Sequence, residues 1–446
     1  MTRPIGIDLF AGAGGMSLGF EQAGFDIVAA VEIDPVHAAV HEFNFPHCAV
    51  LPRSVVGLSG QQIRKAAGIG TRKVDVVFGG APCQGFSLIG QRAFDDPRNA
   101  LVKDFLRIVD ELDATYFVFE NVKGLTVGKH RDFLDELIAL AQGMGYDVRL
   151  PWKVLDASDF GTPQHRERLI LFGAKRGKKV PDYPAAINQA ADGRGKTDKS
   201  LPIGPTVHDA LGDLPNAENF DTLLASDKVR TSDWGAASPY AQEMRMLANN
   251  AWHFGYVRKW DAQLLTASAR TNHSPISRRR YAETNGGEVE PISRFFRLPA
   301  TGLSNTLRAG TDGARGAFTS PRPIHYRYPR CVTVREMARL HGFPDWFQFN
   351  ETKWHGARQI GNAVPPPLAR AVARTVINAI GIQPTQPFEL IEMGSDALLR
   401  MNLSQAADYF GVLMPPSRRD RKSGAVKRKQ HDIEAIRLNA LELEDA

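Results

Sequence analysis

The sequence predicts an α/β fold with a doubly wound, mostly parallel sheet, accompanied by a smaller irregular domain. Short apolar runs alternate with helical periods from the N-terminus to about residue 174, which is typical of such a sheet. A glycine-rich turn follows the first apolar run. From about residue 175 to 297, Gly, Pro, Asn, Asp and Ser interrupt the apolar pattern, so this part is expected to be irregular.

The predicted elements follow one another in the order that the doubly wound fold requires. The apolar runs predict strands at residues 5–10, 27–32, 74–79, 116–121 and 168–174. Helical periodicity predicts helices at residues 18–24, 35–44, 61–67, 101–112 and 133–143. Helical patterning returns at 334–340 and 365–380, and an amphipathic pattern after His431 is compatible with a terminal helix.

Composition indicates a globular protein with reduced cysteines. The 446 residues are 43% apolar, and no run has the length of a membrane span or the pattern of a cleavable signal, so we expect a cytoplasmic protein. The three cysteines, Cys48, Cys83 and Cys331, are an odd number without close pairing.

The charge distribution is compatible with a polyanionic partner. The net charge is +6, with a basic triplet at Arg278 to Arg280 and seven basic residues between Arg418 and Lys429. A solvated surface is the alternative explanation for each cluster.

The turn after the first predicted strand, Asp8-Leu-Phe10-Ala-Gly12-Ala-Gly14-Gly15, lets a ligand approach the backbone closely. Ser17 stands in the place of the third glycine of the dinucleotide fingerprint, which argues against a bound pyrophosphate. Glu32 ends the second predicted strand, where a carboxylate can accept hydrogen bonds from ribose hydroxyls. With Phe10 as a face for adenine, S-adenosylmethionine fits this pattern; a plain tight turn and a surface glutamate are the alternatives.

A cysteine and a carboxylate follow two neighbouring predicted strands. Cys83 comes after Pro82 at the end of one strand, and Glu120 ends the next, so both side chains are expected at one sheet edge. Carbon C5 of a pyrimidine is a poor nucleophile, and thiolate addition at C6 would supply the electron density that its alkylation needs. Glu120 would then donate to ring N3, with its pKa raised in the complex. A buried structural cysteine is the alternative for Cys83.

Two further segments are expected at the same sheet edge. Arg166, in Gln164-His-Arg-Glu-Arg168, could hold the pyrimidine carbonyl oxygen or a phosphate, or else belong to a surface salt-bridge cluster. The segment Gln359-Ile-Gly361-Asn362-Ala-Val364 precedes a helix whose free amides could meet the carboxylate of methionine, with a capped helix as the alternative.

The chain closely resembles the DNA (cytosine-5)-methyltransferases, particularly bacterial modification enzymes. The likeness covers most of residues 5–175 and 300–380, and the order of its motifs is distinctive: Asp8-Leu-Phe-Ala-Gly-Ala-Gly-Gly, Val31-Glu-Ile-Asp-Pro35, Gly80-Ala-Pro-Cys-Gln84, Glu120-Asn-Val122, Gln164-His-Arg-Glu-Arg168, Thr333-Val-Arg-Glu336, Arg339-Leu-His-Gly-Phe-Pro344 and Gly361-Asn-Ala-Val364.

The resemblance implies a role for each matching residue and no metal. It implies Cys83 as nucleophile, Glu120 as N3 donor, Arg166 as substrate-orienting cation, and Asn121 and Arg168 as further catalytic-site residues. Contacts with S-adenosylmethionine are expected from Phe10, Gly12, Gly14, Gly15, Glu32, Ile33, Pro82, Asn362 and Val364, and contacts with DNA from Gln84, Ser87, Arg92, Arg98, Arg278 and Arg294. One departure is Leu51-Pro-Arg53-Ser54-Val55, where the family usually places an aspartate for the adenine amino group.

The resemblance also implies a domain organisation. We expect a catalytic and cofactor-binding large domain at residues 1–175 and a target-recognition small domain with a hinge at 176–344. A segment at 345–382 would return to the large domain, and a basic extension would occupy 383–446.

The expected activity is methylation of C5 in a flipped-out cytosine of double-stranded DNA. Such an enzyme is expected to act as a monomer associated with the bacterial nucleoid, as the modification enzyme of a restriction-modification system with a separately encoded endonuclease. The alternatives are a tRNA cytosine-5 methyltransferase, whose recognition region is usually more compact, and a catalytically silent DNA-binding regulator. A nicotinamide-dependent dehydrogenase and an amino-group methyltransferase fit the motifs less well.

Overall fold

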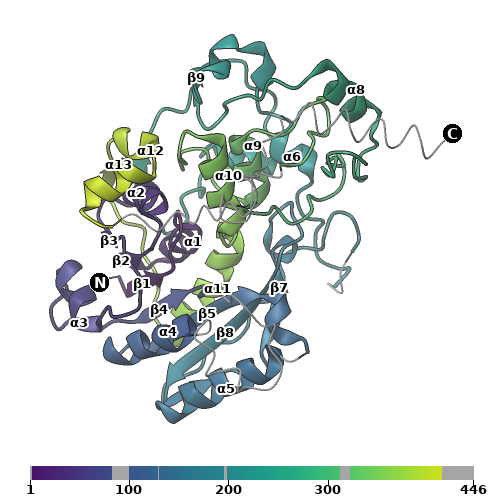
Figure 1. Cartoon of the computed structure of the whole chain (residues 1–446). Coiled ribbons are helices and arrows are strands. Elements are labelled where there is room, and N and C mark those ends of the chain that lie inside the picture. Colours follow the sequence, from purple (N-terminus) through teal and green to yellow (C-terminus); the bar gives the residue numbers. More distant parts are fainter. Residues whose placement is uncertain (1–2, 83–99, 129, 195–197, 312–321, 414–446) are drawn as a thin grey trace, which may run out of the picture.

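The computed structural model describes residues 3–82, 100–128, 130–194, 198–311 and 322–413, and it contains an eight-stranded mixed sheet (Figure 1). The strand order is β3-β2-β1-β4-β5-β8-β6, and β7 also pairs with β8. The first five strands in this order are parallel, whereas β8 is antiparallel to β5. The predicted fold class, a doubly wound and mostly parallel sheet, is confirmed.

The predicted strands correspond to five of the eight. The observed strands are β1 (Ile5–Leu9), β2 (Asp26–Val31), β3 (Ala49–Leu51), β4 (Val76–Gly79), β5 (Tyr116–Val122), β6 (Tyr146–Val148), β7 (Lys153–Asp156) and β8 (Glu167–Lys175). Strands β3, β6 and β7 were not predicted. These strands have three or four residues, which is too short for a period-two pattern to stand out.

Side chains of the central strands alternate between the two faces of the sheet. On β5, Phe117 and Phe119 pack in one core, and Tyr116 and Val118 pack in the other. The first core lies against α3 (Gly60–Ala66), α4 (Ala100–Glu111) and α5 (His130–Gly143). The second lies against α1 (Gly15–Ala23) and α11 (Pro366–Ile380).

Helices α1 and α11 pack at very close range, although most of the chain separates them in sequence. A Cβ atom at Gly15 would lie 2.6 Å from the carbonyl oxygen of Val364, and one at Gly19 would lie 2.6 Å from the amide nitrogen of Arg370. Glycine at these positions therefore lets the C-terminal helix return to the glycine-rich turn at the N-terminus.

The predicted recognition region contains short elements, as its composition indicates. They are α6 (Val207–Leu211), β9 (Val229–Arg230), α7 (Pro239–Met244), β10 (Val257–Lys259), β11 (Leu264–Leu265) and α8 (Pro275–Glu283). Its apolar side chains join the same core as α11 and α9 (Val334–His341), so the core is continuous from the sheet into this region.

Charged side chains are also buried where α9 packs against the segment that follows α6. The guanidinium of Arg339, on α9, donates to the carboxylates of Asp345 and Asp213, and both ion pairs lie away from solvent. Such pairs demand good geometry, because each charge has lost its hydration.

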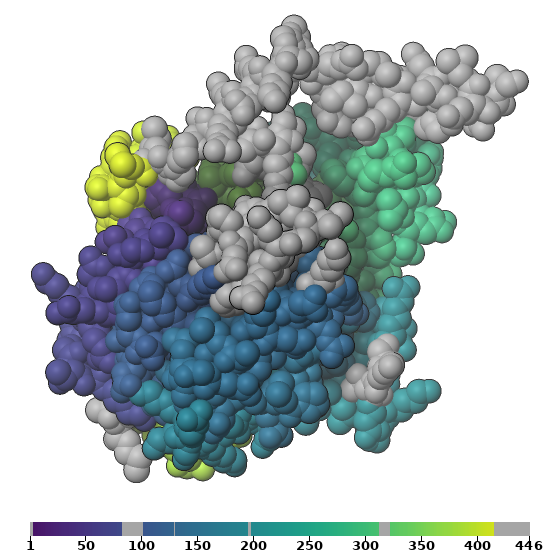
Figure 2. Space-filling model, turned by 60° about the horizontal axis from the view of Figure 1, so that its bottom comes forward, coloured from purple at the N-terminus to yellow at the C-terminus, as the bar shows by residue number. Residues whose placement is uncertain are grey.

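The described part of the C-terminal extension is integrated with the rest of the fold. Strand β12 (Leu390–Glu392) pairs in parallel with β10. Helices α12 (Ala397–Arg400) and α13 (Leu403–Phe410) share an apolar cluster with α2 (Pro35–Asn44), and Figure 2 shows them in yellow against the purple N-terminal part. The helix predicted after His431 and the basic run from Arg418 to Lys429 lie outside the described residues.

Within the described ranges, no helix combines the length and hydropathy that crossing a membrane requires.

The close approach of α1 and α11 predicts that Gly19→Ala destabilises the fold. The added methyl group collides with the backbone of α11, so we expect the free energy of unfolding to fall by about 2–3 kcal/mol. Urea unfolding followed by circular dichroism measures this change. Gly143→Ala is the control, because no neighbouring atom lies within 4 Å of a Cβ atom there and alanine favours the helix. Equal effects of both substitutions would contradict the packing argument.

Candidate active site

Several strand termini meet at the carboxyl edge of the parallel sheet. Leu9 on β1 and Phe119 on β5 both pair with Gly79 on β4, so the segments that follow these strands start side by side. Strand β8 runs in the opposite direction and begins at this edge, where Arg168 pairs with Val122. The predicted cofactor motif and the predicted catalytic motifs therefore lie along one edge.

The Glu120 carboxylate lies buried at this edge, with 8% of the residue exposed. Its Oε1 forms an ion pair of 2.7 Å with Nε of Arg168. Gly80 leaves room for Oε2, because a Cβ atom at that position would collide with it. Burial raises the pKa of Glu120, and the neighbouring guanidinium groups of Arg168 and Arg166 oppose that shift.

Asn121 supports the segment that leads to Cys83. Its Nδ2 donates to the carbonyl oxygen of Ala81 at 3.0 Å, two residues before the predicted nucleophile. Pro82 is exposed. Cys83 itself lies outside the described residues, as do the predicted DNA contacts Gln84, Ser87, Arg92 and Arg98.

Arg166 is 1% exposed and links three segments of the chain. Its Nη1 donates to the carbonyl oxygen of Leu307 at 3.0 Å, and its Nη2 donates to that of Gly361 at 2.8 Å. Its Nε has no hydrogen-bond partner among the described residues. Burial lowers the pKa of Arg166 well below its usual value. Of the two predicted arginines, Arg168 is therefore the one that contacts Glu120, while Arg166 is tied to backbone carbonyls.

The rest of the segment before β8 joins the sheet to the C-terminal part of the chain. The Gln164 side chain accepts from the amide of Leu307 at 3.0 Å and contacts Nδ1 of His341 at 2.9 Å. His341 in turn reaches the carbonyl oxygen of Ala363 through Nε2 at 3.0 Å. Gln164 and His341 thus hold the segments around 307 and 363 beside Arg166.

Glu32 is fixed at the end of β2 by two backbone amides. Gly12 N–H donates to Oε2 and Asp34 N–H donates to Oε1, both at 2.8 Å. Burial raises the pKa of Glu32. Next to it, the apolar side chain of Ile33 is 60% exposed. The glycine-rich turn begins at Phe10, whose φ of 64° lies in the left-handed region.

Beneath this turn, Asp8, Ser17 and His41 form a buried polar cluster that was not predicted. The Ser17 hydroxyl donates to Asp8 at 2.6 Å and lies 3.0 Å from Nε2 of His41. Burial raises the pKa of Asp8 to about 8 and lowers that of His41 to about 3. The cluster accounts for serine in the place of the third glycine, and the Asp8/Ser17 pair was the signal that could have revealed it.

The segment after Gly361 differs from the sequence-based prediction. Residues 353–362 form α10 (Lys353–Asn362), so Gly361 and Asn362 end a helix, and Asn362 is exposed. The following helix α11 begins with Pro366 and Pro367, which have no N–H. The first two residues of this helix therefore offer no amide to a carboxylate, and the predicted contact of its amides with the methionine carboxylate stays a prediction. Val364 is buried beside Gly15, as the tight packing of α1 and α11 requires.

The two arginines predicted to contact DNA from the recognition region, Arg278 and Arg294, have different surroundings. Arg278 forms an ion pair with Glu218. Arg294 is exposed. Ser54, where the family usually has an aspartate, accepts from the amide of Val56 at 3.1 Å.

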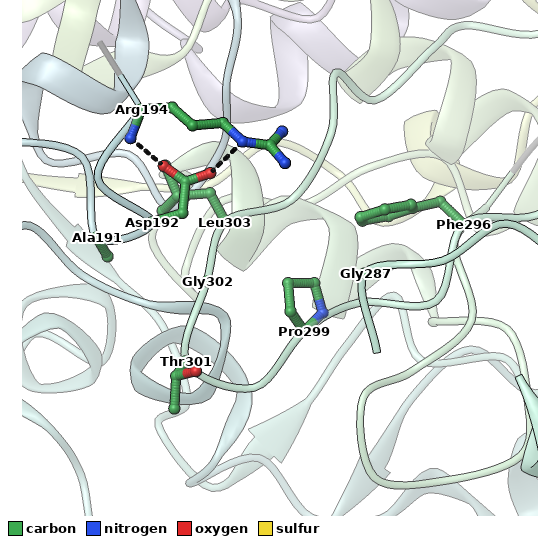
Figure 3. A pocket seen from close by; sticks show the side chains of 9 residues that line it. All are labelled: Ala191, Asp192, Arg194, Gly287, Phe296, Pro299, Thr301, Gly302 and Leu303. Carbon is green, nitrogen blue, oxygen red and sulfur yellow. Dashed lines mark hydrogen bonds and ion pairs between the residues drawn. The ribbon is translucent and has the colours of Figure 1, made fainter. Parts of the chain in front are cut away.

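A hollow of about 390 Å³ lies within the recognition region, between residues 191–194 and 287–303 (Figure 3). Arg194 extends from one side and the ring of Phe296 faces it from the other. Among the described residues, no group of three His, Cys, Asp or Glu side chains could hold a metal ion.

Comparison with known proteins agrees with this arrangement. The family model described as C-5 cytosine-specific DNA methylase matches residues 5–378. The type II methyltransferase M.XorII of Xanthomonas oryzae pv. oryzae is 55% identical over 412 residues, covering 92% of this chain and 93% of that protein. M1.HphI of Haemophilus parahaemolyticus is 33% identical, covering 83% of this chain and 86% of that protein.

Solved structures share the fold. A crystal structure of a protein from an E. coli prophage, described as a DNA modification methyltransferase, has a TM-score of 0.67 and 33% identity, with coverage of 85% of this chain and 100% of that one. The S. pombe Dnmt2 methyltransferase, at 15% identity and a TM-score of 0.51, covers 85% of this chain and 100% of its own, and it shares the fold alone.

The family implies use of S-adenosylmethionine and a DNA substrate. With the matching order of motifs along one sheet edge, the family model over residues 5–378 and the close relatives leave one identity: the chain belongs to the C-5 cytosine-specific DNA methylase family and is a DNA (cytosine-5)-methyltransferase.

Proposed function

We propose that this protein methylates one cytosine within a specific double-stranded DNA sequence through covalent attack by Cys83, as the modification enzyme of a restriction-modification system. The observation that supports this most is the buried Glu120 carboxylate, paired with Arg168 beside the segment that leads to Cys83. The relatives named type II methyltransferases support the restriction-modification setting.

The cofactor end fits an adenosine group. Glu32 presents a rigid carboxylate for ribose hydroxyls, and Ile33 offers an exposed apolar surface beside it. Gly12 leaves open space in the described part of the chain, since no atom there lies within 4 Å of a Cβ atom at this position. We expect Phe10, Gly14, Gly15, Pro82, Asn362 and Val364 to complete the site; Ser54 then stands where the family's adenine-binding aspartate would be. When bound, S-adenosylmethionine supplies an electrophilic methyl group. No metal takes part in this proposal.

The chemical end fits thiolate addition to cytosine. The Cys83 thiolate forms a bond to C6, and the displaced electron pair moves toward C5 and N3, where protonated Glu120 donates a hydrogen bond. Once C5 carries the methyl group, water takes the C5 proton, the electron pair of that bond restores the C5–C6 double bond, and the C6–S bond breaks to release the thiolate. In this proposal Arg168, rather than the predicted Arg166, holds the base beside Glu120, which its ion pair with Glu120 supports. Arg166 keeps the surrounding segments in position through its carbonyl contacts.

The DNA must present its cytosine outside the helix, because the thiolate cannot reach C6 inside a duplex. We propose that the recognition region, including Arg278 and Arg294, contacts the DNA around the extruded base. The enzyme is proposed to act as a monomer at the bacterial nucleoid in the cytoplasm, with a separately encoded endonuclease as its counterpart.

The mechanism predicts that Cys83→Ala abolishes methylation. DNA incubated with parent or variant enzyme and S-adenosylmethionine is mapped for 5-methylcytosine at base resolution. We expect methylation at one cytosine of a defined sequence by the parent protein and none by the variant, because alanine cannot add to C6. No methylation by the parent would instead favour a catalytically silent DNA-binding regulator, and methylation of tRNA alone would favour the RNA-directed alternative.

The Glu120 ion pair predicts that Arg168→Met lowers kcat/KM for DNA by about 10²-fold, because a charged hydrogen-bond donor beside the base is lost. Removing the cation also raises the pKa of Glu120 further. Steady-state methyl transfer measures the change. Lys123→Met is the matched control, since this exposed lysine pairs only at the surface with Glu167, and it should retain parent activity. If Lys123→Met lowered kcat/KM as much as Arg168→Met, the role proposed for Arg168 would be contradicted.

Phosphate contacts predict a steep salt dependence of DNA binding. Between about 50 and 200 mM salt, the affinity for duplex DNA should fall by about 10³-fold or more, as measured by fluorescence anisotropy. Arg294→Ala should reduce the slope of log affinity against log salt by about one. Arg176→Ala, beyond the opposite end of β8, should leave the slope unchanged. An affinity that does not change with salt would argue against a phosphate-tracking surface.

A further inference from the structure

His165 lies between two carboxylates from different parts of the chain. Its Nδ1 is 2.9 Å from Oδ2 of Asp156, and its Nε2 is 3.0 Å from Oδ2 of Asp192. Asp156 ends β7 in the sheet, whereas Asp192 belongs to the loop that enters the recognition region. A neutral imidazole has one N–H and can donate to one of two ionised carboxylates. Both contacts together therefore require the doubly protonated ring.

The electrostatic surroundings favour that protonated ring. Asp156 and Asp192 are the charged groups that act on His165, and they raise its pKa to about 9 against the opposing effect of burial. The Ser158 hydroxyl is 3.5 Å from Nδ1, and Nε of the exposed Arg194 lies 3.7 Å from the same Oδ2 of Asp192 that contacts His165. Burial instead lowers the pKa of six other described histidines, which are His41, His253, His273, His325, His341 and His355.

The backbone of His165 joins a third segment to these two. Its amide donates to the carbonyl oxygen of Ser304 at 3.0 Å, and its carbonyl oxygen accepts from the Thr306 hydroxyl at 2.7 Å. The segment 304–306 leads directly to Leu307, whose carbonyl oxygen accepts from Arg166.

The same carboxylate that holds the imidazole also holds the backbone of Arg166. Oδ1 of Asp156 accepts from the Arg166 amide at 2.9 Å, and the Arg166 carbonyl oxygen accepts from the amide of Ala157 at 3.1 Å. At the other end, Asp192 is part of the wall of the hollow drawn in Figure 3. The Asp156–His165–Asp192 bridge thus runs from the reaction edge of the sheet to the recognition region.

We propose that charged His165 is a positioning residue, which fixes the recognition loop at Asp192 and the segment 304–306 relative to Arg166 and Arg168. The inference rests on the proposed function, in which Arg168 holds the extruded cytosine and Arg166 keeps the surrounding segments in position. The pKa of His165 is raised above its unfolded value near 6.5, so the bridge is fully formed below about pH 6.5 and is lost as the pH rises through about 9. When the bridge is lost, the recognition region is less well aligned with the reaction edge. The KM for DNA should therefore rise, while kcat changes less.

The experiment measures kcat and KM for DNA from about pH 6.5 to 10 at constant ionic strength. For the parent enzyme, KM should rise about tenfold with a midpoint near pH 9, as one charge-assisted hydrogen bond is lost. His165→Arg keeps a charge with several donors over the whole range and should remove that rise. His165→Gln and Asp192→Asn should raise KM at every pH without a transition near 9. His208→Gln, which removes another histidine of the recognition region, should keep the parent profile.

The protonation state of the His165 ring can also be measured directly in the parent protein, so this test does not depend on whether the variants fold. Nitrogen NMR of ¹⁵N-histidine-labelled parent protein at about pH 7.5 should show His165 protonated at both nitrogens; a singly protonated ring would overturn the inference. A parent-like pH profile for His165→Gln, or an unchanged alkaline rise for His165→Arg, would overturn it as well. In each of those cases the proposed function stands if the parent enzyme methylates DNA. Absence of methylation by the parent, with a doubly protonated ring, would instead refute the proposed function.

Discussion

The burial of the Arg166 guanidinium constrains the whole reaction side of the molecule. A buried cation is costly unless acceptors surround it, and two of its donors reach carbonyl oxygens of Leu307 and Gly361, which are far away in sequence. The backbone after Leu307 packs closely against Gly361, and glycine is needed there because a Cβ atom would lie 2.5 Å from the carbonyl carbon of Arg308. The start of β8, the segment around Leu307 and the end of α10 must therefore meet at one point.

Small residues set the distances along the rest of the sheet edge. Gly80 leaves space for the Glu120 carboxylate, and Gly15 leaves space for the backbone at Val364. The carboxylates at this edge then differ by their partners: Glu32 is held by amides, whereas Glu120 is held by Arg168. The first arrangement suits neutral ribose hydroxyls, and the second suits a ring whose charge changes during the reaction.

Long elements and sheet-edge motifs were predictable because they leave local signals. The helix at residues 35–44 was predicted with its observed bounds, since Asp34 and Pro35 mark its start. Helix α10 was not predicted, although Thr352 caps it, because its many polar and glycine residues hide the period. Strands β3, β6 and β7 were not predicted because they are too short to show a period-two pattern. The choice between Arg166 and Arg168 as the partner of Glu120 was also beyond the sequence. Residues two apart on an extended segment share a face, and it is the tertiary partners, backbone carbonyls for Arg166 and the carboxylate for Arg168, that distinguish them.

The sequence by itself determined the fold class and the family, because strand ends, glycine turns and the order of motifs are local properties. The tertiary structure alone decided which charges meet. His165 lies 9 residues from Asp156 and 27 from Asp192, yet it contacts both. Protonation and ion pairing depend on burial and on distances of a few ångströms between remote segments, and no sequence pattern encodes those directly.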